Sequence, residues 1–498
     1  MPDCLLSADG NRIVYVAADA RGWPTTLRVR DLDRRGPDRT VLVSQGGAGS
    51  RLRIRRASNP AYILVADGVR SHWRVTALEL AALNRPPTVL PRATSLERCD
   101  VGLWRGAPLF CELSTDAVGD THLTVTTRSP IGDRRHTRRL GRIGTPEDLR
   151  ATDAGLLVRA THHSEERVLR FPLLPTPAAR DEILVHGPGR FDLSLTGFAE
   201  SVGCVVLERC AGQTPGVHAW DRTGSRLAVA DSVPALAPPA LARKDVMVAA
   251  DNARVPVSLA WSPTTNTAGF TGPLVLFVYG AYGVRLSLDG IDGIRALTDA
   301  GLAVGVVGVR GGGGPDGWHE AGRGPRRHVS VSDLRAAVKH LRGGSEPGIK
   351  VTALGLVGAS AGGFLVGAAL NQFGADVDVA VMTNGFLDPI PTLLDDTSPL
   401  TASDRDEWGD LRRCPRAYRA LAELSPYRNL TTCLTTKTLL LVSDGDRQVS
   451  PAQSLKWCLR ARALGSDVEL WYFPDSGHSR MSGGPRATTA VHGWLVTA

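Results

Sequence analysis

The sequence predicts two domains of different fold class: an all-β domain over residues 1–243, followed by an α/β domain with a doubly wound, mostly parallel sheet over residues 244–498. In the first part, short apolar runs alternate with turn signals, a pattern typical of strands. In the second, near-continuous apolar runs alternate with helical patterns, as expected of strands buried on both faces. One of these runs ends in Gly358-Ala-Ser-Ala-Gly362, a single serine between glycines at the entry to a helix.

The composition is that of a globular protein and excludes several other classes. The chain has 498 residues, 43% hydrophobic and 22% charged, which is ordinary for a soluble protein of two or three domains. Its net charge is +8, but the 58 basic residues are scattered along the chain and 50 acidic residues offset most of their charge. The sequence therefore indicates no nucleic-acid partner. The sequence lacks a secretion signal and a membrane-length apolar segment, so we expect a cytoplasmic protein with no membrane partner. Eight cysteines without metal-ligand spacing predict reduced thiols and no metal or other cofactor.

Repeated hairpins characterise the N-terminal part. Strands are predicted at 12–17, 26–30, 61–66, 154–160 and 204–208. Similar units return every ~40–50 residues, the period of propeller blades, so residues 1–243 would hold about five blades. A pair of packed β-sheets is the structural alternative.

The pattern changes after the Pro- and Ala-rich segment 234–240, where a hairpin over 246–261 leads into the second domain. Strands are predicted at 273–279, 302–309, 353–358, 377–382, 438–442 and 468–473, with helices at 331–341 and 452–461. Ser360 then follows a strand at the sheet edge where such folds place their sites.

A serine hydroxyl becomes a useful nucleophile when an imidazole accepts its proton and a carboxylate orients that imidazole. His478 is predicted as the base because it follows the last strand, at the same sheet edge as Ser360. His492 falls on a terminal helix and His340 at the end of an amphipathic helix, so both are expected to be packed or surface residues.

The acid is expected directly after the strand 438–442, where the sequence offers Asp444 and Asp446. Asp446 is preferred because the D-x-x-V-x-P spacing that starts with it places it just before the next helix. Asp444 is expected to shape the turn, and a purely structural role of both acids is the alternative.

An oxyanion formed by attack of Ser360 needs at least two hydrogen-bond donors. The backbone N–H of Ala361 is the first candidate, and Tyr279, which follows the strand 273–279, is the second; for Tyr279 an ordinary packing role is the alternative. The glycine run 311–314 lacks the G-K-[ST] ending of a phosphate loop. We expect it to form a flexible loop bordering the active site.

Seven segments, taken in order, resemble the prolyl oligopeptidase family of serine peptidases, most of all its oligopeptidase B members. They are Val278-Tyr-Gly-Ala-Tyr-Gly283, Val309-Arg-Gly-Gly-Gly313, Gly358-Ala-Ser-Ala-Gly-Gly363, Leu394-Asp-Asp-Thr-Ser-Pro-Leu-Thr401, Glu407-Trp-Gly409, Ser425-Pro-Tyr-Arg-Asn429 and Asp475-Ser-Gly-His478.

The resemblance implies a β-propeller that caps an α/β-hydrolase domain and restricts access to short peptides. It also implies a triad of Ser360, Asp446 and His478, with Tyr279 as an oxyanion donor. The family's propeller has more blades than residues 1–243 can hold, so a truncated or reduced cap is expected.

In oligopeptidase B, acidic residues near the Glu-Trp-Gly motif bind the basic residue before the cleaved bond. Here Asp404, Asp406 and Glu407 occupy that segment, and a carboxylate pair suits a guanidinium group; a solvated charged turn is the alternative. We therefore predict a serine oligopeptidase that cleaves short peptides after Arg or Lys. The same triad would also serve a prolyl-specific peptidase, an esterase or a peptide ligase or macrocyclase, and an inactive propeller scaffold is a further alternative. The oligomeric state stays open.

Overall fold

The computed structural model contains two compact units, one comprising Met1–Cys210 and Thr214–Leu236 and the other Ala211–Gln213 and Ala237–Ala498. The Pro- and Ala-rich segment 234–240 lies outside the described residues except for Ala240. The structure describes residues 4–497 apart from 8, 20–23, 34–35, 46–49, 70–71, 84–85, 92–94, 105–106, 117–119, 128–132, 153–154, 163–164, 173–181, 188–189, 195–201, 210–215, 222–225, 228–239, 264–268, 316, 396–400, 447, 475 and 479–484.

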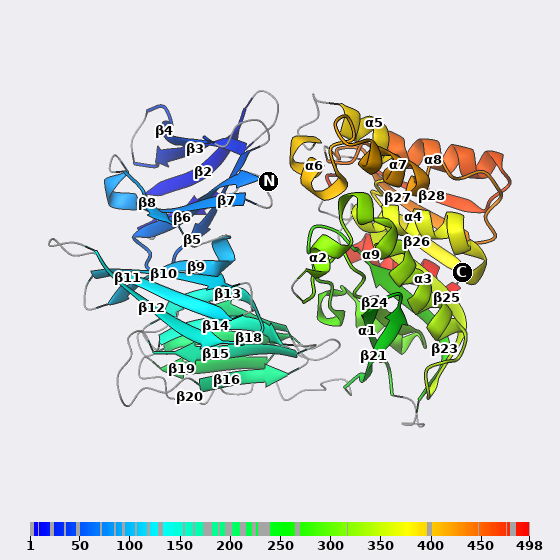
Figure 1. Cartoon of the computed structure of the whole chain (residues 1–498), viewed down its shortest axis with the longest axis horizontal. Helices are drawn as coiled ribbons and strands as arrows, with labels where there is room; N and C mark the ends of the chain where they lie inside the picture. Colours follow the sequence, from blue (N-terminus) through cyan, green and yellow to red (C-terminus); the bar gives the residue numbers. More distant parts are fainter. Residues whose placement is uncertain are drawn as a thin grey trace. The chain divides into compact units, whose positions relative to one another are not determined.

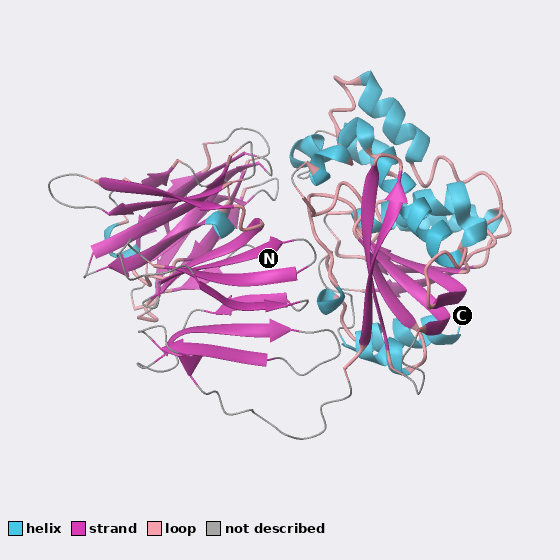
Figure 2. Cartoon of the chain, turned by 60° about the horizontal axis from the view of Figure 1, so that its bottom comes forward, coloured by secondary structure: helices cyan, strands magenta, loops and turns pink. Residues whose placement is uncertain are grey.

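The described part of the first unit forms five four-stranded sheets, each made of four strands consecutive in sequence (Figures 1 and 2). Neighbouring strands within them pair antiparallel. The strands are β1 Cys4–Leu6, β2 Arg12–Ala18, β3 Pro24–Asp31, β4 Arg39–Val43, β5 Arg51–Arg56, β6 Tyr62–Val69, β7 His72–Glu79, β8 Thr88–Leu90, β9 Cys99–Trp104, β10 Ala107–Thr115, β11 Thr121–Thr127, β12 Arg134–Gly141, β13 Thr145–Thr152, β14 Gly155–His162, β15 Glu165–Phe171, β16 Glu182–Gly187, β17 Arg190–Ser194, β18 Val202–Arg209, β19 Gly216–Asp221 and β20 Arg226–Leu227.

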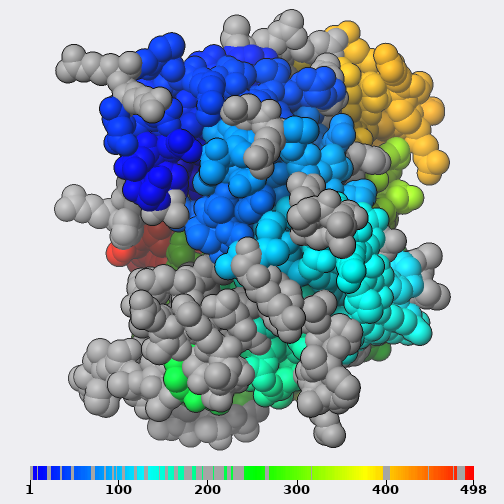
Figure 3. Space-filling view, turned by 90° about the vertical axis from the view of Figure 1, so that its left-hand side faces the viewer, coloured from blue at the N-terminus to red at the C-terminus, as the bar shows by residue number. Residues whose placement is uncertain are grey.

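Each sheet buries its apolar face against the next one along the chain. Val14 and Val16 of β2 share one core cluster with Leu52 of β5 and Ile63 of β6. The next cluster joins β6 and β7 to β9 and β10. The surface in Figure 3 accordingly changes from blue to cyan in sequence order over neighbouring sheets. A single such sheet cannot bury its own apolar face, so the stack holds together as a repeat.

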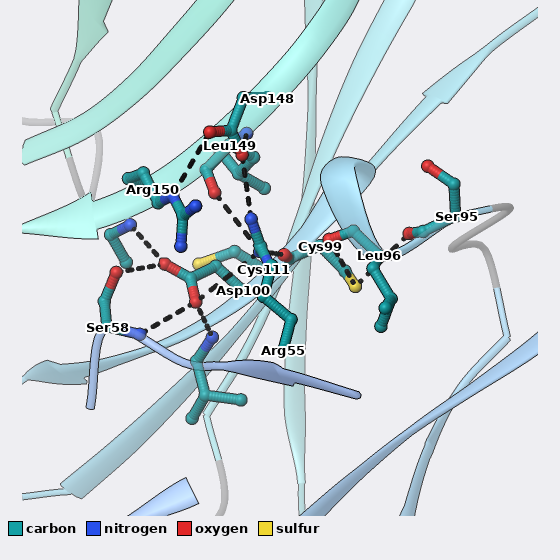
Figure 4. Close-up of polar contacts among 12 residues, drawn as sticks. Arg55, Ser58, Ser95, Leu96, Cys99, Asp100, Cys111, Asp148, Leu149 and Arg150 are labelled. Carbon is teal, nitrogen blue, oxygen red and sulfur yellow. Dashed lines mark hydrogen bonds and ion pairs between the residues drawn. The ribbon is translucent and has the colours of Figure 1, made fainter. Parts of the chain in front are cut away.

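A buried polar network also ties three successive sheets together (Figure 4). Asp100 of β9 is fully buried and accepts hydrogen bonds from the backbone N–H groups of Ser58, at 3.0 Å, and Ala151 of β13, at 2.7 Å. Arg55 of β5 lies 3.9 Å from Asp100 and donates to Asp148 of β13 at 2.8 Å. Because buried polar groups are costly when unpaired, this network specifies how the three sheets align.

The second unit is built on one eight-stranded sheet of order β21-β22-β24-β23-β25-β26-β27-β28 (Figure 1). The first two strands pair antiparallel to their neighbours, and the strands from β24 to β28 run parallel. The strands are β21 Ala242–Ala250, β22 Ala253–Trp261, β23 Phe270–Val278, β24 Ala303–Val307, β25 Ile349–Ala359, β26 Val379–Thr383, β27 Lys437–Ser443 and β28 Val468–Phe473.

Helices cover both faces of this sheet. One core cluster joins α3, α4 and α8 to alternate strand residues such as Leu274 and Leu276 of β23. A second joins α1 and α9 to the other face, which includes Val275. The helices are α1 Ile294–Asp299, α2 Trp318–Ala321, α3 His328–Arg342, α4 Ala361–Phe373, α5 Pro389–Leu394, α6 Thr401–Trp408, α7 Pro415–Leu424, α8 Pro451–Ala463 and α9 Pro485–Thr497.

Among the described residues, no helix is both long and apolar enough to cross a bilayer. The same residues contain no group of three or more His, Cys, Asp or Glu side chains arranged to hold a metal ion.

Candidate active site

Ser360 occupies a sharp turn between β25 and α4, with φ 54° and ψ −117°. A residue other than glycine rarely adopts such angles, so the surrounding structure must hold it. Its N–H donates to the carbonyl of Thr383 at 2.9 Å, and its own carbonyl accepts from Phe386 at 3.0 Å. The hydroxyl is thereby presented at the carboxyl end of the sheet, which is the geometry of a nucleophile elbow.

At both glycines of the motif, another part of the backbone passes too close to leave room for a side chain. A Cβ on Gly358 would lie 2.4 Å from the carbonyl oxygen of Gly362, and a Cβ on Gly362 would lie 2.4 Å from that of Val278. Gly362 therefore allows the end of β23 to pack directly against the first turn of α4.

We expect Gly362→Ala to destabilise the protein by about 1–3 kcal/mol, because the added methyl group must displace the backbone of β23. Gly493→Ala is the matched control: this helical glycine has open space around its Cβ position, so the change should stabilise by about 0.5–1 kcal/mol. Thermal unfolding of both variants tests the pair, and equal shifts would contradict the steric argument.

His478 connects the serine to a carboxylate. Its Nε2 lies 3.0 Å from Ser360 Oγ, and its Nδ1 lies 2.6 Å from Asp446 Oδ2. The His478 side chain is 15% exposed and that of Asp446 is fully buried. The three residues follow β25, β27 and β28, whose carboxyl ends meet at one sheet edge.

The loop after β27 orients Asp446. The second carboxylate oxygen, Oδ1, accepts the backbone N–H groups of Gln448, at 2.8 Å, and Val449, at 2.9 Å. At the strand end, Ser443 donates its N–H to the side chain of Asn384 at 2.9 Å, which joins β26 to β27. One carboxylate oxygen is therefore used for positioning and the other is directed at His478.

The other acid and the other two histidines have different surroundings from the triad residues. Asp444 is exposed, His340 pairs with Glu346 at 3.1 Å, and His492 is only 9% exposed. Burial lowers the pKa of His492, whose ring packs so closely on Gly293 that a Cβ there would be 2.4 Å away.

Two groups near Ser360 could donate to an oxyanion. Ala361 is the first residue of α4, so its N–H has no acceptor within the helix and lies at the positive end of the helix dipole. Tyr279 is half-buried and follows Val278, which pairs in parallel with Gly358. A row of Asp, His and Ser beside such donors can carry out acyl transfer.

The glycine run is packed tightly, in contrast to the flexible loop expected from the sequence. Gly283 donates to the carbonyl of Gly311 at 3.1 Å, and Gly313 donates to that of Val284 at 3.0 Å. A Cβ on Gly311 would lie 2.6 Å from the carbonyl oxygen of Gly280. The run thus supports the loop that carries Tyr279.

The three acidic candidates lie on α6 but do not face the same way. Asp404 and Glu407 are 6% and 2% exposed, whereas Asp406 is exposed. Positions i and i+2 of a helix point to different sides. Asp404 and Asp406 therefore do not form the adjacent carboxylate pair that the sequence suggested.

Glu407 is engaged inside the protein. One carboxylate oxygen accepts from Arg327, and the other lies 2.7 Å from Nε2 of His319. Burial raises the pKa of Glu407, but the hydrogen bond with His319 and the charge of Arg327 outweigh it and lower the pKa to about 2. Glu407 therefore stays ionised at neutral pH, and both of its oxygens already have protein partners.

Sequence reasoning did not single out His319 or Arg327. Their separations from Glu407 along the chain, 88 and 80 residues, leave no local spacing to reveal the contacts. The one available signal was that both residues lie within the 13 positions that follow the glycine run 311–314.

Comparisons with known proteins agree with this architecture. The model of the prolyl oligopeptidase family matches residues 292–496. Protease 2 of Moraxella lacunata is 34% identical over 197 residues, covering 39% of this chain and 28% of that protein. Human prolyl endopeptidase-like protein is 34% identical over 161 residues, covering 32% of this chain and 22% of that protein. The matched segments thus span about a quarter of these curated relatives.

Solved structures match nearly the whole chain in fold. Oligopeptidase B from Trypanosoma brucei, with covalently bound antipain, aligns over 99% of this chain and 72% of its own, with TM-score 0.78 and 17% identity. A post-proline cleaving enzyme from Rickettsia typhi aligns over 100% and 74%, with TM-score 0.78 and 14% identity. The predicted fold class, an N-terminal β-propeller-like domain with a C-terminal α/β-hydrolase domain, is confirmed.

The second unit thus has the α/β-hydrolase fold, with Ser360 at the sharp turn between β25 and α4. Within this unit, the segment 292–496 matches the prolyl oligopeptidase family.

Proposed function

We propose that this protein is a serine-type oligopeptidase that hydrolyses short peptides through an acyl-enzyme on Ser360. The observation that carries the proposal is His478, which lies within hydrogen-bond distance of both Ser360 and Asp446. In this mechanism Nε2 of His478 takes the proton of the Ser360 hydroxyl as Oγ of Ser360 attacks the scissile carbonyl. The protonated His478 then gives that proton to the leaving amine, and Asp446 stabilises the imidazolium in between.

The tetrahedral intermediate carries a negatively charged oxygen. We assign its stabilisation to hydrogen bonds from the N–H of Ala361 and the hydroxyl of Tyr279. Water then attacks the acyl-enzyme with His478 as general base, and Ser360 is released. The peptide class of substrate is proposed because similar proteins carry the names Protease 2 and prolyl endopeptidase-like.

We further propose cleavage after Arg or Lys, with a carboxylate of α6 binding the basic side chain. Because Asp404 and Asp406 point to different sides of the helix, a single one of them would make the contact. A lone carboxylate can still form a charge-assisted, bidentate pair with a guanidinium group.

The test is steady-state hydrolysis of fluorogenic peptides that differ in the residue before the scissile bond: Arg, Lys, Pro, Ala or Phe. We expect Arg and Lys to be preferred. One of the two variants, Asp404→Asn or Asp406→Asn, should lower kcat/KM for Arg substrates by about 10–100-fold, because it removes the charge that pairs with the substrate side chain. Hydrolysis of the Ala substrate serves as the internal control. Preference for Pro would overturn the basic specificity and leave the triad in place; product masses would distinguish capture by water from capture by an amine.

A further inference from the structure

The loop that carries Tyr279 has an unusual backbone. Gly280, Tyr282 and Gly283 all have positive φ, at 64°, 60° and 64°. Glycine adopts this conformation readily, but a tyrosine does so at a cost. Contacts from outside the loop must therefore hold residues 279–283 in place.

In addition to the glycine run, three side chains bond to this loop, and we call Arg327, Glu407 and Trp408 the loop clamp. Arg327 donates to the carbonyl of Gly280, and Trp408 Nε1 donates to the Tyr282 hydroxyl at 2.8 Å. The backbone of Tyr282 hydrogen-bonds to the carboxylate of Glu407. Each member of the clamp thus bonds directly to the loop.

Glu407 links the clamp together. Its carboxylate accepts a hydrogen bond from Arg327. The guanidinium carbon of Arg327 lies 4.6 Å from the centroid of the Trp408 ring. The side chains of Arg327 and Glu407 are 3% and 2% exposed. Removing the charge of Glu407 would leave a buried guanidinium without its main partner, which favours rearrangement of everything it holds.

The clamp is also connected to the nucleophile elbow. The Trp408 ring packs against the rings of Phe364 of α4 and Phe386, with distances between ring centroids of 5.0 Å and 5.1 Å. Phe364 and Phe386 donate their backbone N–H groups to the carbonyl of Ser360. The clamp therefore joins the Tyr279 loop to the turn that presents Ser360.

We propose that Glu407 is a positioning residue that fixes Tyr279 relative to Ser360 through Arg327 and Trp408. The inference rests on the proposed function, because Tyr279 matters as the second oxyanion donor. It replaces the substrate-binding role predicted for Glu407 from the sequence. A misplaced hydroxyl would stabilise the transition state less while leaving substrate binding nearly unchanged.

The experiment is a double-mutant cycle on the full chain with an Ala and an Arg substrate. We expect Glu407→Gln to lower kcat by about 10–100-fold with KM changed less than about 3-fold, and to add less than about 3-fold in a Tyr279→Phe background. Glu423→Gln, at an exposed position of α7, is the control and should leave kcat unchanged. Tyr282→Phe, a milder change that removes the Trp408 contact, should show the same non-additivity.

Two results would overturn the proposal. Equal losses from Glu407→Gln in the wild-type and Tyr279→Phe backgrounds would mean a role independent of Tyr279. A rise in KM confined to the Arg substrate would mean direct substrate contact. Failure of the proposed function is recognised separately, since the wild-type protein would then hydrolyse neither substrate.

Discussion

Replacing Ser360 with Ala is expected to abolish hydrolysis of the fluorogenic peptides, with kcat falling by at least about 10⁴-fold. Without the hydroxyl no acyl-enzyme forms, and the residual rate comes from the oxyanion donors and substrate binding alone. The strained turn itself should relax or persist without loss of fold, so the melting temperature should stay close to that of the wild type. Steady-state kinetics and thermal unfolding measure the two effects.

Ser345→Ala, at an exposed serine, provides the matched control and should retain wild-type rates. A fluorophosphonate probe adds an independent readout, because it should label the wild-type protein and not Ser360→Ala. Full activity in Ser360→Ala would place the chemistry on another residue. Absence of labelling in the folded wild-type protein would instead favour the inactive scaffold.

The second large effect is expected for Asp446→Asn, which should lower kcat by about 10³–10⁴-fold with little change in KM. An Asn side chain can donate a hydrogen bond to Nδ1 of His478, which leaves the proton on Nε2, the nitrogen that must accept it from Ser360. The substitution keeps the size of the side chain and its contacts with the N–H groups of Gln448 and Val449. The check is a measurement of kcat and KM for the variant and the wild type from pH 6 to 9.

Asp444→Asn is the control for this prediction. Asp444 lies two residues earlier on the same loop and is exposed, so its charge is solvated and the change should cost little activity. If instead Asp444→Asn were the damaging variant, the acid would be assigned to the wrong carboxylate.

Much of the candidate site could be predicted because its signals are local or follow from strand order. The glycines around Ser360 are required within a single turn, where a Cβ on Gly358 or Gly362 would collide with a carbonyl oxygen. Asp446 and His478 follow parallel strands, and the carboxyl ends of such strands meet at one edge. Placing His478 after the last strand was therefore enough to select it over His492.

The acidic segment shows where this reasoning fails. The sequence treats Asp404, Asp406 and Glu407 as equivalent neighbours, yet α6 buries the first and third and exposes the second. The choice depends on how α6 docks against residues far away in the chain, among them Arg327 and His319. The packed state of the glycine run depends in the same way on the loop 280–284.

The sequence by itself determined the two fold classes, the parallel strands whose ends place Ser360, Asp446 and His478 at one edge, and the residue types available for acyl transfer. These follow from hydrophobic periodicity and turn chemistry, which act over a few residues. The tertiary structure alone decided that Glu407 pairs with Arg327 and that Asp100 joins three sheets of the propeller-like unit. Such pairings are set by burial, since a charged group removed from water must find its partner among whatever residues the fold brings near it.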